Sequence, residues 1–188
     1  YDGDQMLYII AKHRKQQGTL KGGVVGTLMT NLGMQRALEK IKVPFARAAV
    51  GDRYVLELMQ NRGWQLGGEN SGHIICLDKH TTGDGIVSAL QVLHAMRAYR
   101  ADMAHLTREL ALYPQVLVNV KVAKGFDFSN QRPVRDALGE AEADLGDKGR
   151  VLLRASGTEP VVRVMVEGKP QAKVKQWAAI IAQAVRKA

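Results

Sequence analysis

The sequence predicts an α/β domain followed by a small α+β domain. Through residue 113, short apolar strands alternate with segments of helical periodicity, which is typical of a layered α/β domain. From residue 114 onward come an alternating strand, a helix, a strand–loop–strand and a closing helix, a pattern that favours helices on one face of an antiparallel sheet. Pro114 separates the two patterns, and 188 residues are enough for two small domains.

Residues 1–17 are predicted to form a helix. Asp4 precedes apolar residues at helical spacing, so we expect Asp4 to cap this helix. These apolar residues are Met6, Leu7, Ile9 and Ile10. Asp2 and Asp4 also flank a glycine, as paired carboxylates of a hard-cation site can do. The helical spacing favours the cap.

Two strand–helix pairs follow the polar break at residues 16–19. Residues 22–27 predict a short strand, and residues 44–50 predict another. The helix between them carries apolar residues at the i, i+3, i+4, i+7 spacing: Met34, Ala37, Leu38 and Ile41. Asp52 is placed to cap the next helix, which ends at Arg62–Gly63.

The rest of the α/β domain is predicted to contain one strand and two helices. Ile74–Leu77 is an apolar strand, and after a polar loop Asp84 is expected to cap a helix over residues 86–99. The apolar residues of this helix fit packing on a sheet: Val87, Leu90, Leu93 and Ala95. A second helix is predicted over residues 103–112.

The α+β domain begins with valines that alternate with polar residues over 116–122, which predicts a half-buried strand. Phe126 and Phe128, in the following loop, are interpreted as local packing. Two helix faces are predicted, one from Val134, Leu138, Ala141 and Leu145, the other from Val174, Trp177, Ala178, Ile181 and Val185. Between them, alternate residues of a strand point to opposite sides: Val162, Val164 and Val166 to one, Val161, Arg163 and Met165 to the other.

Composition and charge narrow the class of protein. The chain is 46% hydrophobic and 24% charged, as in soluble globular proteins, and its net charge of +9 favours an anionic partner. Aromatic residues make up only 5% and no nucleic-acid-binding motif is present, so we expect no nucleic-acid partner. No apolar run approaches the ~18 residues of a membrane span. Cys76 is the only cysteine, which excludes an internal disulfide and fits the cytoplasm.

A loop over residues 154–160 combines the groups that bind a phosphate. It reads Arg-Ala-Ser-Gly-Thr-Glu-Pro between two strand-like segments. A forked cation, hydroxyl donors and a glycine backbone that allows close approach suit a phosphate. The candidates are Arg154, Ser156, Gly157, Thr158 and, on the following strand, Arg163. The alternative is a hairpin loop whose Ser and Thr only satisfy turn amides.

A second polar loop, over residues 68–73, reads Gly-Glu-Asn-Ser-Gly-His. Glu69 and Ser71 would lie on one side of an extended segment, where a carboxylate and a hydroxyl suit the donor and acceptor hydroxyls of a sugar. His73 would lie on the same side as a candidate general acid/base. The alternative is that Glu69 is a solvent-facing acid and His73 a satisfied histidine at a strand edge.

His73, Cys76 and His80 also raise the question of zinc. An extended chain would send His73 and Cys76 to opposite faces, and no fourth ligand is obvious. We therefore expect no zinc site and interpret Cys76 as a core residue.

Both loops resemble motifs of the α-D-phosphohexomutases. Residues 154–160 resemble the phosphate-binding loop of that family's last domain, and residues 68–73 resemble its sugar-binding loop, Gly-Glu-x-Ser-Gly-His. The two motifs stand in the family's order, and the resemblance continues through Val50–Tyr54 and Thr82–Gly85, so it covers nearly the whole chain. Within the family the resemblance is closest to the phosphoglucosamine mutases.

The resemblance implies a domain assignment. Residues 1–17 would be the helix that closes the second domain, and residues 18–113 the third, sugar-binding domain, a phosphoglucomutase-like three-layer α/β/α fold. Residues 114–188 would be the fourth, phosphate-binding domain, an α+β fold with an antiparallel sheet like that of the TATA-box-binding protein. The first residues lack an initiator Met and the regions of a signal peptide. We therefore expect a fragment that begins inside a longer protein.

The resemblance also implies an activity. The family member would be an isomerase that interconverts glucosamine 6-phosphate and glucosamine 1-phosphate, for UDP-N-acetylglucosamine and peptidoglycan synthesis. In the family a phosphoserine of the first domain donates its phosphoryl group to the sugar, which gives a hexosamine bisphosphate intermediate. This intermediate then returns its other phosphate to the serine. Mg²⁺, held by an Asp-Gly-Asp-Gly-Asp-Arg loop of domain 2 that is absent here, balances charge during transfer.

This chain would supply substrate binding and no metal ligand. The residues that match the family's substrate-binding motifs are Glu69, Ser71, Arg154, Ser156, Gly157, Thr158 and Arg163, with His73 as the acid/base candidate. Asp52 and Arg53 match another family loop, and we assign them no role. The nucleophilic serine's motif is absent, so we expect the fragment alone to be inactive.

Several alternatives stay open. The chain could belong to a phosphomannomutase or phosphoglucomutase of the same superfamily, or be a stand-alone phosphosugar-binding module. A third alternative, a basic nucleic-acid-binding protein, is supported by the net charge alone. The expected partners are a phosphosugar, the missing N-terminal domains of the same chain and, for the full-length protein, a second copy in a homodimer; no membrane partner is expected.

Overall fold

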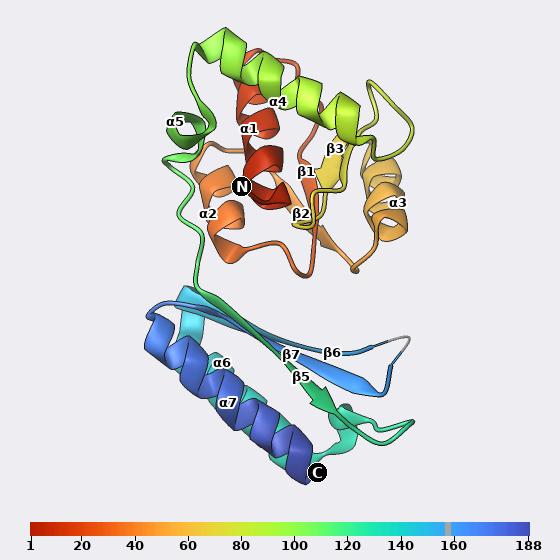
Figure 1. Ribbon diagram of the computed structural model, residues 1–188, viewed down its shortest axis with the longest axis vertical. Helices are drawn as coiled ribbons and strands as arrows, with labels where there is room; N and C mark the ends of the chain where they lie inside the picture. Colours follow the sequence, from red (N-terminus) through yellow and green to blue (C-terminus); the bar gives the residue numbers. More distant parts are fainter. Residues whose placement is uncertain (157–158) are drawn as a thin grey trace. The chain divides into compact units, whose positions relative to one another are not determined.

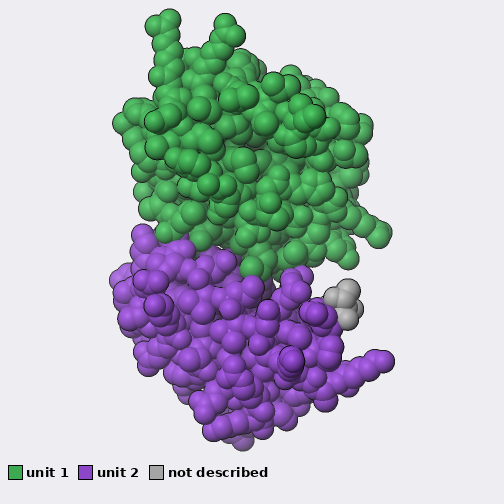
Figure 2. All heavy atoms as spheres, viewed as in Figure 1, with its two compact units in different colours: residues 1–112 green, residues 113–188 purple. Residues whose placement is uncertain are grey.

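The computed structural model describes residues 1–156 and 159–188, which form two compact units. Unit 1 is Tyr1–Leu112 and unit 2 is Tyr113–Ala188, coloured separately in Figure 2. The division falls one residue before the predicted boundary at 113/114. Among the helices of the described residues, none combines the length and apolar character needed to cross a bilayer.

Unit 1 contains five helices and four strands in its described residues. In chain order they are α1 (Gly3–Gln16), β1 (Val24–Thr27), α2 (Leu32–Lys40), β2 (Phe45–Ala48), α3 (Asp52–Arg62), β3 (Leu66–Gly68), β4 (Ile74–Cys76), α4 (Gly85–Tyr99) and α5 (Met103–Thr107). The sheet order is β2-β1-β3-β4, with β1 parallel to both β2 and β3, and β4 antiparallel to β3 (Figure 1).

Helices cover both faces of this sheet. Because successive strand residues point to opposite faces, Val24 and Val25 of β1 belong to different cores. Val24 packs with residues of α1, α2, α4 and α5, whereas Val25 packs with Val55 and Met59 of α3. The unit is therefore a three-layer α/β/α domain, and the predicted fold class is confirmed.

Unit 2 is a three-stranded antiparallel sheet with two long helices on one face. Its elements are β5 (Gln115–Lys121), η1 (Phe128–Asn130), α6 (Arg132–Leu145), η2 (Gly146–Lys148), β6 (Gly149–Ala155), β7 (Val161–Gly168) and α7 (Gln171–Lys187). The sheet order is β5-β7-β6. Val162, Val164 and Val166 are buried in a core shared with α6 and α7, as predicted, and Phe126 and Phe128 pack against it.

Two predicted helix caps are wrong and one is confirmed. Asp2, not Asp4, caps α1: its side chain accepts from the Gln5 backbone N–H, and the Gln5 side chain accepts from the Asp2 N–H. Asp4 is buried and accepts from the Asn31 N–H at 2.7 Å. Gly51 occupies the N-cap of α3, which places Asp52 in the first turn. Asp84 caps α4 as predicted, accepting from Val87 N–H.

Three further expectations need correction. Residues 1–17 do not stand apart: α1 packs into the core of unit 1 through residues 7–11. The helix predicted over 103–112 ends at Thr107, and the chain continues as a turn that still buries Leu110. On α4, Ala95 is buried as predicted, but Leu90 and Leu93 are each 56% exposed, because the helix turns Val92 rather than these leucines into the core of unit 1.

Candidate functional site

The loop of unit 1 that was predicted to bind sugar is the tight connection of the β3–β4 hairpin. The Glu69 N–H donates to the His73 carbonyl at 3.0 Å, and the Gly72 N–H donates to the Glu69 carbonyl at 3.0 Å. The segment is therefore a turn, and the expectation that Glu69, Ser71 and His73 lie on one side of an extended chain is wrong. Ser71 is exposed in this turn.

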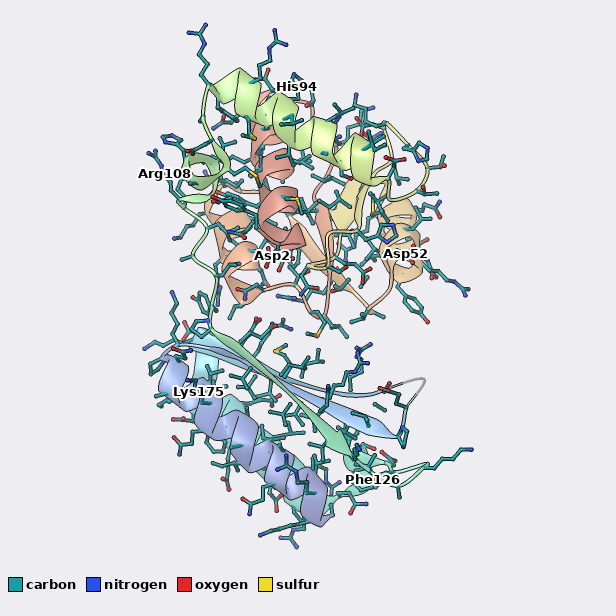
Figure 3. The ribbon with its side chains drawn as sticks, in the orientation of Figure 1. Asp2, Asp52, His94, Arg108, Phe126 and Lys175 are labelled. Carbon is teal, nitrogen blue, oxygen red and sulfur yellow. The ribbon has the colours of Figure 1, made fainter. Side chains whose placement is uncertain are left out.

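Glu69 and His73 nevertheless meet at the start of α3. The Gly51 N–H donates to Glu69 Oε1 at 3.1 Å, and His73 Nδ1 lies 3.7 Å from Asp52 Oδ2. Figure 3 labels Asp52 on α3 and Asp2 at the N-terminus of α1. One Glu69 oxygen is held by a backbone amide, and the other can still accept from a hydroxyl. The start of α3 thus contacts Glu69 through the Gly51 amide and His73 through the Asp52 carboxylate.

Two glycines outside the hairpin make room for it. The Gly3 N–H donates to the Asn70 carbonyl at 2.9 Å, and a Cβ on Gly3 would lie 2.1 Å from the Glu69 carbonyl oxygen. A Cβ on Gly83 would lie 1.9 Å from His73 Cδ2. His73 is therefore held between Asp52 and the backbone at Gly83. Sequence reasoning missed both glycines, since nothing in their local sequence shows which distant loop they contact.

Among the described residues, the candidate metal ligands do not come together as a magnesium or zinc site. Asp2 and Asp4 both accept from backbone amides, as described above. Cys76 is 2% exposed and lies in the core, and burial raises the pKa of its thiol. Within the described ranges, no three His, Cys, Asp or Glu side chains are grouped to hold a metal ion. We derive no chemical step through a metal bound to this chain.

In unit 2, the two arginines of the predicted phosphate site are neighbours. Arg154 of β6 pairs with Arg163 of β7, which in turn pairs with Asn119 of β5. Their side chains share the sheet face opposite α6 and α7, because the alternate residues of β7 fill the core. Asn119, Arg163 and Arg154 thus form a row across the sheet, which we call the arginine row. Sequence reasoning missed Asn119, although the alternation of β5 could have indicated it.

The arginine row lacks negative charge of its own. In the described part of the chain neither Arg154 nor Arg163 forms an ion pair, and Arg154 Nε is buried without a hydrogen-bond acceptor. Two neighbouring cations repel each other, and a buried N–H without an acceptor is unfavourable. An anion that accepts from both guanidinium groups relieves both problems.

Another row of the same sheet is already neutralised. Glu167 is fully buried and pairs with Gln115 on β5 and Arg150 on β6. Its carboxylate accepts from Gln115 Nε2 at 2.9 Å and from Arg150 Nε. Arg150 therefore has a carboxylate partner within the sheet, whereas among the described residues Arg154 and Arg163 have none.

The rest of the predicted phosphate loop is only partly described. The Ser156 N–H donates to the Val161 carbonyl at 2.8 Å, so its backbone closes the loop between β6 and β7. Ser156 is half-buried and Glu159 is exposed. Gly157 and Thr158 lie outside the described residues.

Comparisons with known protein families agree with this architecture. The family model for the phosphoglucomutase/phosphomannomutase α/β/α domain III matches residues 2–113. The model for the phosphoglucomutase/phosphomannomutase C-terminal domain matches residues 117–184.

Curated relatives match the chain along its length. A phosphoglucosamine mutase of Nitrosospira multiformis is 64% identical over 188 residues, which is 100% of this chain and 41% of the relative. One from Thiobacillus denitrificans is 58% identical over 188 residues, again 41% of the relative, and one from Aeromonas salmonicida is 55% identical over 187 residues, 42% of the relative. The chain thus spans about two fifths of the relatives' length.

Solved structures show the same fold at lower sequence identity. An N-acetylglucosamine-phosphate mutase in its product complex superposes with a TM-score of 0.83 at 22% identity, over 98% of this chain and 44% of that chain. An Aspergillus fumigatus N-acetylphosphoglucosamine mutase in complex with GlcNAc-6P and magnesium gives 0.80 at 22% identity, over 98% of this chain and 47% of that chain. With both domain models matched in order, the chain belongs to the phosphoglucomutase/phosphomannomutase family.

Proposed function

We propose that this chain is the substrate-binding C-terminal part of a phosphoglucosamine mutase, which interconverts glucosamine 6-phosphate and glucosamine 1-phosphate. The observation that carries the proposal is the arginine row, with its buried Arg154 Nε and no ion pair to Arg154 or Arg163 among the described residues. The 55–64% identity to curated phosphoglucosamine mutases favours glucosamine over mannose or glucose phosphates.

The arginine row is proposed to hold the phosphate that is not reacting. A mutase must bind its sugar in two orientations, so the group that holds this phosphate should grip its oxygens without reading where the phosphate is attached. Forked guanidinium groups do this, because they bind oxygens in pairs. Ser156, Gly157 and Thr158 are proposed to add hydroxyl and backbone donors to the same phosphate.

The β3–β4 hairpin is proposed to contact the sugar. Glu69 and Ser71 accept from and donate to hydroxyls that are reached in both orientations. His73, beside Asp52, is the candidate that moves a proton to or from the reacting oxygen. Asp52 would orient the imidazole rather than contact the sugar.

The remaining chemistry is assigned to segments outside this chain. A phosphoserine would donate the phosphoryl group through a hexosamine bisphosphate, and Mg²⁺ would stabilise the charge of transfer. The preceding domains would carry both the phosphoserine and the Mg²⁺ site. The complete enzyme is proposed to be a cytoplasmic isomerase that assembles as a homodimer. The 188-residue chain alone is expected to bind phosphosugar weakly and to show no turnover.

An amide-resolved NMR titration of the 188-residue chain tests these roles. Glucosamine 6-phosphate, glucose 6-phosphate, mannose 6-phosphate and inorganic phosphate are added in parallel. We expect Arg154, Ser156 and Arg163 to shift with every phosphate, and Glu69–His73 to shift only with sugar phosphates and most with glucosamine 6-phosphate.

The proposal fails if inorganic phosphate leaves Arg154 and Arg163 unshifted while moving residues elsewhere. Equal shifts of Glu69–His73 with all three sugars would remove the glucosamine assignment and leave a general phosphohexomutase. Interconversion of the two glucosamine phosphates by the purified chain would contradict the assignment of phosphoryl transfer to other segments.

A further inference from the structure

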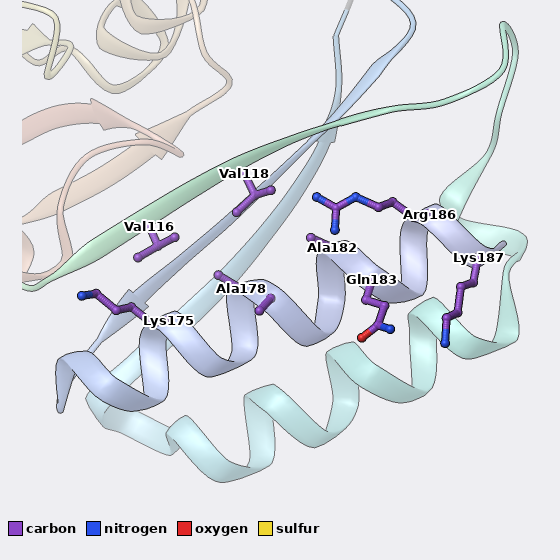
Figure 4. Close-up of a pocket in the computed structure, with 9 residues that line it drawn as sticks. Val116, Val118, Lys175, Ala178, Ala182, Gln183, Arg186 and Lys187 are labelled. Atoms are coloured by element: carbon purple, nitrogen blue, oxygen red, sulfur yellow. The ribbon is translucent and has the colours of Figure 1, made fainter.

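Unit 2 carries a groove of about 700 Å³ between β5 and α7 (Figure 4). Its floor is apolar and comes from Val116 and Val118 of β5 and from three small residues of α7, Ala178, Ala179 and Ala182. Its rim is polar and comes from α7: Lys175, Gln183, Arg186 and Lys187. The alanines leave a hollow beside the strand that larger side chains would fill.

The strand that borders this groove is the edge of its sheet. The order β5-β7-β6 leaves one side of β5 without a neighbouring strand in the described residues. The Val122 N–H donates to the Pro160 carbonyl, and the Gly168 N–H donates to the Pro114 carbonyl. Antiparallel bonding alternates along a strand, so the amides of Leu117, Asn119 and Lys121 point to the open side. Such an edge can pair with an added strand.

The charge around the groove selects the chemistry of a partner. Lys175, Arg186 and Lys187 form no ion pair within the described parts of the chain. Arg186 also borders an adjoining pocket that includes Lys121, which extends the basic rim along the edge. A second copy of this chain, with a net charge of +9, would bring like charges together, whereas an acidic segment is attracted.

We propose that the β5–α7 groove binds an extended acidic segment of a partner protein by strand addition. The segment's backbone pairs with the amides of Leu117, Asn119 and Lys121. On the face of the segment that is turned toward α7, small apolar side chains lie over the alanines, and carboxylates nearer its ends contact the basic rim. The groove is on the helix-covered side of the sheet and the arginine row is on the other, so this interaction is separate from phosphosugar binding.

The probe is a synthetic peptide, Glu-Ser-Val-Ser-Val-Ser-Glu, whose alternate residues place two valines and two glutamates on one face of the strand, and its binding is measured by fluorescence anisotropy. We expect binding that weakens as salt is raised, because the rim charges are exposed. A peptide with lysine in place of glutamate, and one N-methylated at alternate peptide nitrogens, should each bind at least about tenfold more weakly, a difference of about 1.4 kcal/mol. Hydrogen exchange should slow at Leu117, Asn119 and Lys121 when the first peptide is bound.

Matched variants locate the interaction. Ala179→Leu fills the groove from an exposed helical position and should reduce affinity about tenfold or more, whereas Ala172→Leu, exposed on the same helix but outside the groove, should leave affinity unchanged. Equal binding of the N-methylated peptide, unchanged binding to Ala179→Leu, or no binding at millimolar peptide would each overturn the proposal. A dimer in sedimentation that Ala179→Leu abolishes would overturn it in favour of a second copy.

Discussion

The two candidate binding regions are supported in different ways. The β3–β4 hairpin of unit 1 is held by backbone contacts, in which Gly3 and Gly83 leave no room for a side chain and the Gly51 amide holds Glu69. The arginine row of unit 2 stands on paired strands, beside a row whose charge is neutralised by Glu167. The conformation of the hairpin therefore depends on the absence of side chains at Gly3 and Gly83, whereas anion binding by the arginine row depends on its uncompensated positive charge. A different kind of substitution disturbs each region.

The largest effect is expected for Gly3→Ala. The new Cβ would lie 2.1 Å from the Glu69 carbonyl oxygen and 2.6 Å from the Gly72 nitrogen, both backbone atoms that cannot rotate away. We expect unit 1 to lose about 3 kcal/mol of unfolding free energy, at the upper end of overpacking effects. Chemical denaturation, monitored by the hydrogen exchange of amides in each unit, measures this loss of unfolding free energy.

Gly85→Ala is the matched control within unit 1. Apart from its chain neighbours and the backbone of its own helix, no atom lies within 4 Å of the position that its Cβ would take, so the stability of this variant should stay near that of the unchanged chain. If Gly3→Ala and Gly85→Ala had the same stability, the contact between α1 and the hairpin would not be the close one described.

A smaller loss is expected when the neutralised row of unit 2 is broken. Glu167→Ala removes the carboxylate that accepts from Arg150 and Gln115, and we expect a loss of about 2 kcal/mol of unfolding free energy. This figure is below that of a fully buried pair, because the Arg150 side chain is 20% exposed and can regain water. Glu167→Gln keeps an acceptor oxygen and should recover part of the loss. A loss confined to unit 1 would contradict the assignment.

The difference between the regions also explains what the sequence could predict. The alternating valines of unit 2 indicated both the strands and the side on which Arg163 lies, because the period of a strand fixes the face of each residue. Arg154 and Arg163 were predicted to share a site from the chemistry of the loop over residues 154–160, and the structure pairs them on neighbouring strands. The motif at residues 68–73 was identified from the sequence, but its backbone conformation was not. A turn has no regular periodicity from which the directions of its side chains can be predicted.

Tertiary contacts account for the remaining corrections. Asp4 is of a residue type that commonly caps helices, yet it is buried and its carboxylate accepts from the backbone N–H of Asn31, at the start of another helix. Gly3 is needed because the loop at Glu69 and Gly72, far away in sequence, lies against it, and Gly83 because the His73 ring does. Leu90 and Leu93 match a helical face as well as Val92 does, and only packing decides which of these residues are buried.

The arginine row can be tested by a change that keeps its charge. Arg154→Lys replaces a planar fork by a single ammonium, so affinity for inorganic phosphate should fall roughly tenfold while stability changes little. Isothermal titration calorimetry measures it, and Arg132→Lys, at an exposed position of α6, is the control. An unchanged affinity would show that net charge alone, rather than the forked geometry, attracts the anion.

The smallest expected effect is on the pH dependence of stability, and it involves the C-terminal end of α1, away from the hairpin. His13 is buried beside the ring of His94, and burial, followed by the charges of His94 and Arg14, lowers the pKa of His13 below its usual 6.5. The unfolded chain therefore binds more protons than the folded chain between this lowered pKa and 6.5, so unit 1 loses stability as pH falls through that window. In His13→Gln the dependence should be shallower. Hydrogen exchange across this pH range should show the change in unit 1 and not in unit 2, and an unaltered slope would mean that other groups set the acid sensitivity.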